Sequence, residues 1–375
     1  MDMSIFYSGE SDDTAGDVGH PQEIHISRMT TSLLLASCPT GYGSGGLGQH
    51  LARVREDALA EGREVGVFCH GGIDSPHLVG GEWEARWFRW PPFRWRPDLR
   101  VWLRHERFDR EVARRLVPAD TVTAFMGAAL HTFRRARELG VRKLVLEMPN
   151  SHPGNVGRQH AAALRLHPLE PSWIGDGFVR KVGLEMAGAD EIRANSDYTA
   201  QSAVAAGIDR SRVVRRHLGC DPRFATIRRL PHPRGLRTVV FVGSLTVFKG
   251  VPLVVDAFRD LEGADLRLLL VGGWTGRGMR KWLEAARVRD PRVDWTSGDP
   301  APHLATAALA VHPSWEDGWG YAPAEALAAR VPLVVSDQTG MKELLVEGGS
   351  DDILPAGDLD AWRSWLRAWA ARTAP

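Results

Sequence analysis

The 375-residue sequence is poor in lysine and cysteine, and its net charge is close to zero. Lysine occurs only at five positions, so arginine supplies nearly all of the positive charge and a lysine within a motif is informative. A net charge of +1 gives no overall field that would favour nucleic acid. Cys38, Cys69 and Cys220 form no CxxC pair, which argues against a zinc site or a disulfide framework and is typical of a reduced, cytoplasmic protein.

Long apolar runs and targeting patterns are also missing. No run of about 18 apolar residues is present, so we expect no membrane-spanning helix. The opening residues are polar and acidic, unlike a signal peptide, and we interpret residues 1–28 as an N-terminal arm.

The rest of the chain alternates strand, loop and helix, which predicts an α/β protein with parallel sheets. The alternation is broken once, by a stretch with two prolines and five arginines, and then restarts. A long loop is expected between a strand ending at Met148 and a helix around Phe178. We therefore predict a first domain, a linker, a second domain and a C-terminal helix, at residues 29–222, 223–237, 238–357 and 358–375.

Two loops follow predicted strands and lead into predicted helices. The loop Gly41–His50 holds five glycines, which lets the backbone approach a ligand closely, although a tight turn explains the glycines equally well. The loop after the strand that ends at Gly243 carries Lys249 to a helix start, where a compact cation suits a phosphate. The alternative is a solvated surface lysine.

The segment 312–337 places acids on both sides of a glycine-rich loop. Asp317 precedes that loop, Glu325 follows it, and Pro323 suits the first turn of a helix. The N–H groups of residues 318–324 are therefore candidates for holding an anion. Because carboxylates repel phosphate, we expect the acids to accept hydrogen bonds from sugar hydroxyls. The alternative is helix capping by Asp317 and a surface position for Glu325.

These motifs resemble the retaining glycosyltransferases of family 4, the glycogen-synthase-like and mannosyltransferase-like enzymes. The stretches "FVGSLTVFKG", "LVGGWTGRG" and "SWEDGWGYAPAEALAARVPLVVSD" carry the resemblance. It implies the GT-B fold, with two Rossmann-like domains facing each other across a cleft. We also expect the C-terminal helix to pack back on the first domain.

The resemblance also implies roles for individual residues. The family pattern is an acid, seven residues and a glutamate, which Asp317 and Glu325 match as contacts to the transferred sugar and to the nucleotide ribose. Lys249 falls on the family's diphosphate-binding lysine, and His152 is our candidate for the family's first-domain histidine, with Asn150 as the alternative. The implied donor-binding set is Gly45, Gly46, Gly243, Ser244, Lys249, Gly318, Trp319, Gly320, Tyr321, Ala322 and Glu325.

Two departures from the family pattern affect these roles. The family often has arginine five residues before the lysine, where this chain has Ser244, so Arg277 or Arg280 would have to substitute. The first acid is an aspartate rather than a glutamate, and the neighbouring Glu316 is an alternative sugar ligand and catalytic candidate.

Two further motifs have simpler explanations. The triplet 358–360, "DLD", resembles a metal-binding motif, but Asp358 precedes a predicted helix and is better explained as its N-cap. No other carboxylate cluster has metal-ligand spacing, so we expect no metal. Arginine alternates with aromatic residues between Trp83 and Leu116. This pattern agrees with three interpretations: packing within the first domain together with a loop that faces the acceptor, contact with a membrane surface, or binding of single-stranded nucleic acid. We expect no nucleic-acid partner.

The resemblance thus implies transfer of a sugar from a nucleotide diphosphate sugar to a hydroxyl or amine of a small molecule or glycolipid, with retention and without a cofactor. We expect a cytoplasmic location, with peripheral contact at the inner membrane face. One alternative is a sugar-nucleotide-binding protein without turnover. Another is a phosphorylase-like enzyme, which would need a pyridoxal group on Lys249, Lys281 or Lys342. The base, sugar, acceptor and oligomeric state stay open.

Overall fold

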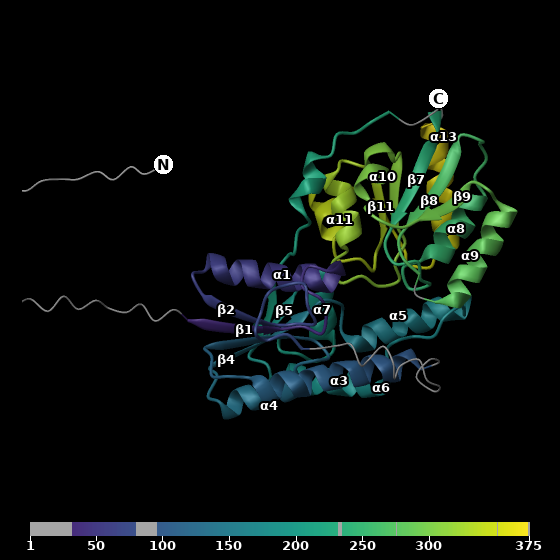
Figure 1. The fold of residues 1–375 in the computed structure, drawn as a ribbon. Coiled ribbons are helices and arrows are strands. Elements are labelled where there is room, and N and C mark those ends of the chain that lie inside the picture. The colour runs from purple at the N-terminus through teal and green to yellow at the C-terminus, as the bar shows by residue number, and fades with distance from the viewer. Residues whose placement is uncertain (1–31, 80–95, 232–234, 275, 351, 374–375) are drawn as a thin grey trace, which may run out of the picture. The chain divides into compact units, whose positions relative to one another are not determined.

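The computed structural model describes residues 32–79, 96–231, 235–274, 276–350 and 352–373. The predicted N-terminal arm and most of the tryptophan-rich start of the segment 83–116 lie outside these residues. The described chain contains two parallel six-stranded sheets with helices on both faces, which confirms the predicted α/β class (Figure 1).

The first sheet has the strand order β2-β1-β3-β4-β5-β6, and all of its neighbours are parallel. Its strands are β1 (Leu33–Ser37), β2 (Glu64–Phe68), β3 (Thr121–Phe125), β4 (Lys143–Met148), β5 (Glu191–Ala194) and β6 (Val213–Arg215). The accompanying helices are α1 (Gly45–Ala60), α3 (Pro97–Arg115), α4 (Leu130–Glu138), α5 (Pro153–Leu166), α6 (Asp176–Gly188) and α7 (Asp197–Ala205), with short 3₁₀ turns η1 (Arg210–Arg212) and η2 (Pro222–Thr226).

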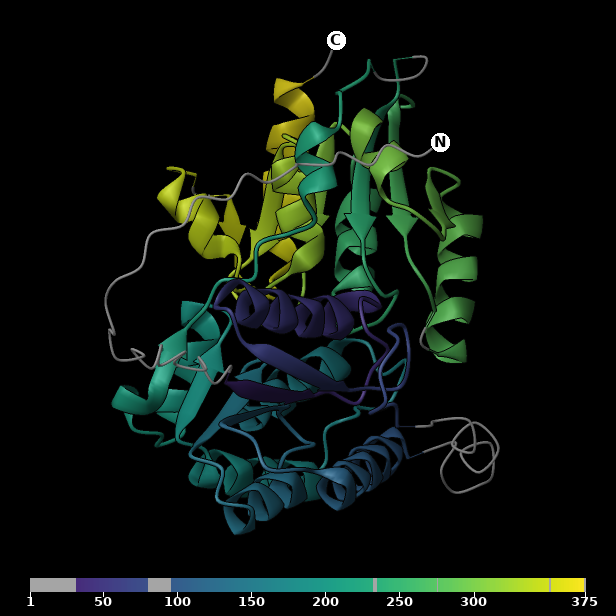
Figure 2. The same ribbon diagram turned by 60° about the vertical axis from the view of Figure 1, so that its left-hand side comes forward.

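The second sheet has the order β12-β11-β10-β7-β8-β9 and is also parallel throughout (Figure 2). Its strands are β7 (Arg237–Val242), β8 (Leu266–Val271), β9 (Val293–Thr296), β10 (Leu309–His312), β11 (Leu333–Ser336) and β12 (Ile353–Leu354). Its helices are α8 (Val251–Arg259), α9 (Arg277–Arg289), α10 (Ala301–Thr306), α11 (Tyr321–Ala328), α12 (Lys342–Glu347) and α13 (Leu359–Arg372).

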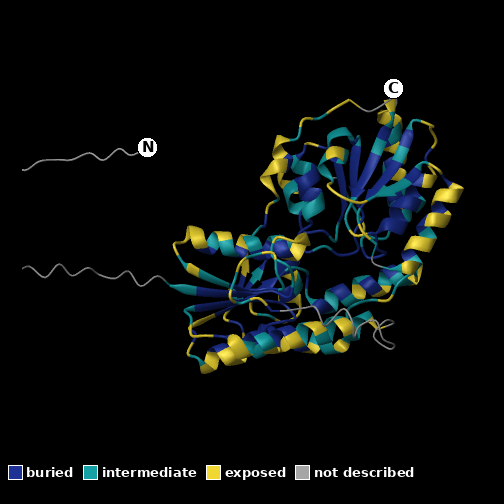
Figure 3. Ribbon diagram, viewed as in Figure 1, coloured by how far each residue is buried: buried dark blue, intermediate teal, exposed yellow. Residues whose placement is uncertain are grey.

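Each sheet buries an apolar core on both of its faces, as the burial colouring shows (Figure 3). In the first sheet α1 covers one face, and α3, α4, α6 and α7 cover the other. In the second sheet α8, α9 and α13 cover one face, and α10, α11 and α12 cover the other. Because these strands are buried on both faces, their sequences are nearly continuous runs of apolar residues such as valine and leucine.

Three features differ from the sequence prediction. The expected long loop contains α5, which begins at Pro153 directly after its N-cap His152. The C-terminal helix packs on α8 of the second sheet, where Trp362 and Leu366 are fully buried, so its predicted packing on the first domain is wrong. Phe224, which falls within the predicted linker 223–237, is buried in the core of the second sheet.

Among the residues that the structure describes, no helix combines the length and the apolar character needed to cross a membrane.

Candidate functional site

Both sheets reverse their winding direction at one point, and the loops of interest lie there. In the second sheet the chain moves outward from β7 through β8 to β9, and then returns to place β10 on the other side of β7. The loops after β7 and β10 therefore meet at the carboxyl edge of the sheet, where α/β proteins bind ligands. In the first sheet the equivalent point lies between β1 and β3, beside the glycine-rich loop.

Lys249 and Asp317, which come from these two loops, form an ion pair. The Lys249 Nζ donates to Asp317 Oδ2 at 2.7 Å and to the carbonyl oxygen of Glu316 at 3.3 Å. The same Oδ2 lies 3.0 Å from His312 Nε2, at the last residue of β10. Burial raises the pKa of Asp317, but Lys249 and His312 lower it further, so this pKa lies well below its usual value. An ammonium has three donors, so Lys249 keeps one for a ligand.

His312 is a site neighbour that the sequence analysis did not identify. It is buried, and burial lowers its pKa although Asp317 opposes that shift. The sequence did hold a signal for it, because His312 is a polar residue at the end of an otherwise apolar strand and stands five positions before Asp317.

Glu316 points away from this pair, although it is the adjacent residue. Its Oε2 accepts from Asn150 Nδ2 and its Oε1 from the Ser151 N–H, each at 2.9 Å. Both donors belong to the loop after β4, in the first half of the chain. The two neighbouring acids therefore have separate partners, and the structure places Glu316 against the loop that carries His152.

The loop between β10 and α11 presents backbone N–H groups. Gly320 has φ +92° and is the N-cap of α11, and Pro323 lies in the first turn, as predicted. The N–H groups of Tyr321 and Ala322 have no hydrogen-bond partner among the described residues. A helix N-terminus with free N–H groups favours an anion. This arrangement agrees with the anion site expected there.

Trp319 from the same loop serves a different purpose. Its side chain is 2% exposed, lies in the core of the second sheet, and donates from Nε1 to the Gly219 carbonyl at 2.8 Å. Its indole is thus part of the framework, and only its backbone lies in the predicted donor-binding loop.

Glu325 lies one turn further along α11 and is 7% exposed. No hydrogen bond joins its carboxyl group to another of the described residues, and burial raises its pKa to about 7. Burying an unpaired carboxyl group costs free energy, so its retention here suits a ligand that supplies hydroxyl donors. The surface position considered as an alternative does not agree with this burial.

The predicted glycine-rich loop 41–50 is helical from Gly45, where α1 begins, and the first turn of α1 reaches α11. A Cβ at Gly46 would lie 3.4 Å from the Tyr321 ring, and Gly45 has φ +60°. The Tyr321 hydroxyl is buried without a hydrogen-bond partner, and burial raises its pKa. Gly46 therefore lies at the contact between the two halves, whereas a Cβ at Gly45 would meet no atom within 4 Å.

His152 caps α5 with its side chain. Its Nδ1 accepts from the Gly154 N–H at 3.1 Å, so the proton of the neutral ring is on Nε2. Burial and Arg158 lower the pKa of His152, which keeps the ring neutral. The cap orients the imidazole and leaves Nε2–H as a donor.

Ser244 and the two arginines considered as substitutes lie in the loop after β7 and in α9. Ser244 follows β7 and is exposed. The backbone before it passes close to Gly272, where an added Cβ would lie 1.8 Å from the Gly243 carbonyl oxygen. Arg280 donates to Glu284 on its own helix, which leaves Arg277, exposed in the first turn of α9, as the candidate to compensate for Ser244.

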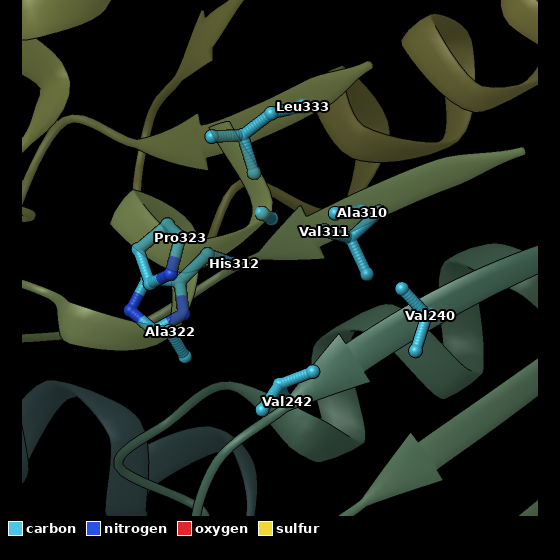
Figure 4. A pocket seen from close by; sticks show the side chains of 9 residues that line it. Val240, Val242, Ala310, Val311, His312, Ala322, Pro323 and Leu333 are labelled. Carbon is cyan, nitrogen blue, oxygen red and sulfur yellow. The ribbon is translucent and has the colours of Figure 1, made fainter. Parts of the chain in front are cut away.

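A small cavity lies under α11 beside the site (Figure 4). The residues that line the cavity are apolar except for His312: Val240, Val242, Ala310, Val311, His312, Ala322, Pro323, Ala326 and Leu333. This lining is typical of a packing gap between a helix and a sheet rather than of a site for a polar donor.

The predicted N-cap role of Asp358 is confirmed, because its Oδ1 accepts from the Ala361 N–H at 3.0 Å. The described residues do bring one group of metal-ligating atoms together, at Glu106, Asp109 and His131. Glu106 and Asp109 belong to α3, and His131 reaches them from α4. Lys181 Nζ lies 2.8 Å from one carboxylate oxygen of each acid and offsets part of their negative charge.

Comparisons with known proteins relate the second half of the chain to one family. Residues 236–369 match the model of the family "Glycosyl transferases group 1". D-inositol 3-phosphate glycosyltransferases from Mycolicibacterium paratuberculosis and Nocardia farcinica are 26% and 27% identical over 204 residues, covering 50% and 49% of this chain. The matches span 46% and 45% of those relatives, so the chain covers about half of their length.

Two solved structures share the fold over most of the chain. Sucrose-phosphate synthase from Thermosynechococcus elongatus superposes with a TM-score of 0.69 at 16% identity, and Anabaena Alr3699/HepE in complex with UDP and glucose with 0.64 at 15%. Each similarity covers 91% of this chain and 90% of the other.

Proposed function

We propose that the protein is a retaining glycosyltransferase. Residues 236–369 match the model of the group 1 glycosyl transferases, and the chain has the GT-B fold. It moves a sugar from a nucleotide diphosphate sugar to a hydroxyl or amine of an acceptor. UDP is the first nucleotide to test, since HepE was solved with UDP and glucose. The acceptor is a small molecule or a glycolipid.

Lys249 and the start of α11 hold the leaving diphosphate. As the bond to the sugar breaks, negative charge grows on the β-phosphate. The remaining N–H donor of Lys249 and the free N–H groups of Tyr321 and Ala322 then stabilise that charge. Asp317 holds the ammonium in place with one oxygen, and its Oδ1 stays available for a sugar hydroxyl.

The other contacts hold the rest of the donor. Glu325 accepts hydrogen bonds from the ribose hydroxyls, for which its buried carboxyl group has no competing partner among the described residues. His152 donates from Nε2 to the transferred sugar. The chemistry needs no metal in this proposal, because cationic and N–H donors of the chain stabilise the leaving group. Retention follows from attack on the face that the diphosphate leaves.

The ion pair of Lys249 with Asp317, beside the α11 N-terminus, is the observation that carries the proposal. Lys249→Ala should lower the rate of UDP release from a UDP-sugar panel by a factor corresponding to about 2–4 kcal/mol, which is typical for one lost transition-state donor. Lys281→Ala, at an exposed lysine of α9, is the matched control and should be as active as the parent. Equal turnover of both variants would refute the diphosphate role.

The alternative is a nucleotide-binding protein without turnover, which is favoured by Ser244 in place of the family's arginine. In that case UDP would bind to the parent in calorimetry, yet no UDP would be released from any UDP-sugar under any acceptor condition. Release that depends on Lys249 excludes this alternative.

Contact with an anionic membrane surface is a second part of the proposal. The exposed residues of α3 include six arginines, of which the last three form ion pairs with Glu106 or Glu111 of the same helix: Arg100, Arg104, Arg107, Arg110, Arg114 and Arg115. Basic side chains gathered on one helix attract anionic lipid. Sedimentation with vesicles containing phosphatidylserine, but not with neutral vesicles, would support this contact. Equal sedimentation with both would contradict it.

A further inference from the structure

The two adjacent acids 316 and 317 connect the two halves of the described chain. Asp317 is bonded within the second half, to Lys249 and His312. Glu316 is bonded to the first half, at Asn150 and Ser151, and the next residue along that loop is His152. One dipeptide therefore joins the lysine of the proposed diphosphate site to the loop of the proposed sugar-binding histidine.

The backbone around this link fits closely. A Cβ at Gly318 would lie 2.1 Å from the Pro149 carbonyl oxygen, which only a glycine tolerates. The Ser196 Oγ donates to the Gly318 carbonyl at 2.6 Å, and Asn195 Nδ2 donates to the Pro149 carbonyl at 2.9 Å. The contact is thus a fitted surface between the loops after β4, β5 and β10.

We propose that Glu316 is a positioning residue that closes the two halves around the donor, by accepting hydrogen bonds from the loop that carries His152. This inference rests on the proposed glycosyltransferase function. Glu316 acts through this loop and does not touch the sugar. When the halves separate, its carboxylate becomes solvated, and when they meet, two donors replace that water.

The chemistry of the link supports a closing device. Glu316 is 4% exposed, and burial raises its pKa, while Lys249, Ser151 and Asn150 lower it. A buried carboxylate needs its donors, so the closed arrangement tolerates little displacement of the 150–152 loop. The Asp317 N–H donates to the Gln338 carbonyl, and the Asp317 carbonyl accepts from Gly340, which fixes the acid dipeptide from behind.

Exchanging the carboxylate and the amide between positions 316 and 150 tests the hydrogen bond that joins them. Asn150→Asp places two carboxylates face to face, and should lower kcat about tenfold or more, since a small misplacement of reacting groups is costly. Glu316→Gln added to Asn150→Asp restores a donor–acceptor pair in reverse order, and should return kcat to within about threefold of the parent. Glu316→Gln alone should have a mild effect, because the Asn150 amide can turn to accept from it.

Further variants keep the result interpretable if Asn150→Asp folds poorly. Asn150→Ala removes one donor without repulsion and should lower kcat less, with no recovery from added Glu316→Gln. Gln159→Ala is the matched control, because Gln159 donates across the halves to Gln338 at 3.0 Å, and among the described residues no side-chain hydrogen bond joins it to residues 150–152. Its kcat should match the parent.

Calorimetric titration with UDP separates this inference from the proposed function. UDP should bind to Asn150→Asp as it binds to the parent, since the proposed contacts of Lys249, Glu325 and the α11 N-terminus with UDP all lie in the second half. Loss of turnover in the double variant, with UDP binding retained, would make Glu316 a sugar ligand and overturn the inference. An unchanged kcat in Asn150→Asp would also overturn it, whereas a parent that binds no UDP would refute the proposed function instead.

Discussion

Glu325→Gln should change stability and nucleotide binding in opposite directions. The Glu325 carboxyl group is buried, and burial raises its pKa from 4.5 to about 7 in the folded protein. Between these two values the folded state binds more protons than the unfolded state, so the free energy of unfolding falls as the pH rises through this window. The shift corresponds to roughly 3 kcal/mol once the pH is above 7.

Glutamine removes this titration while keeping the shape of the side chain. The variant should therefore gain about 3 kcal/mol of unfolding free energy relative to the parent between pH 4.5 and pH 8. Urea denaturation of both proteins at pH 5 and pH 8 measures this difference. If the difference between variant and parent is the same at both pH values, the carboxyl group has no raised pKa and the argument from its burial fails.

Nucleotide binding should respond the other way. The ionised carboxylate is the form that accepts two hydroxyl hydrogen bonds, so UDP binding to the parent should strengthen as the pH rises through 7. Glu325→Gln should lose about 1.5–3 kcal/mol of UDP binding at pH 8, typical of hydrogen bonds to a charged group. Calorimetry at pH 6 and pH 8 tests this, and equal UDP affinity of the two proteins at pH 8 would refute the ribose contact.

Three further perturbations test other parts of the site. Asp317→Asn should lower kcat with little change in KM, because its sugar partner reorganises in the transition state, and a change confined to KM in steady-state kinetics would contradict this. Asp358→Ala should cost about 1 kcal/mol of unfolding free energy in thermal denaturation and leave UDP release unchanged, since it removes only a helix cap. Turnover should survive EDTA, and complete loss that Mg²⁺ or Mn²⁺ restores would show that the chemistry depends on a metal.

The sequence predicted the parts of the structure that local patterns determine. The alternation of predicted strands and helices indicated parallel sheets, and the structure has two. Asp358 stands directly before a helix, as expected of an N-cap residue, and Pro323 lies in the first turn of α11. Lys249 and Asp317 follow neighbouring strands of one sheet, so their meeting at its carboxyl edge could be expected from topology.

Contacts between distant segments could not be predicted in this way. Glu316 and Asn150 are 166 positions apart, and no periodicity indicates that their side chains meet. The same applies to His131 beside Glu106, and to the packing of α13 on α8. Helix α5 was missed although its signal was present, since Pro153 starts it and Val156, His160 and Ala163 form its buried stripe.

A crystal structure of the UDP complex tests the central claim most directly. The account predicts the β-phosphate within hydrogen-bond distance of Lys249 Nζ and of the N–H groups of Tyr321 and Ala322, with the ribose hydroxyls on the Glu325 carboxylate. A diphosphate bound elsewhere, with Lys249 still held by Asp317 and Glu325 in contact with no ligand atom, would contradict it.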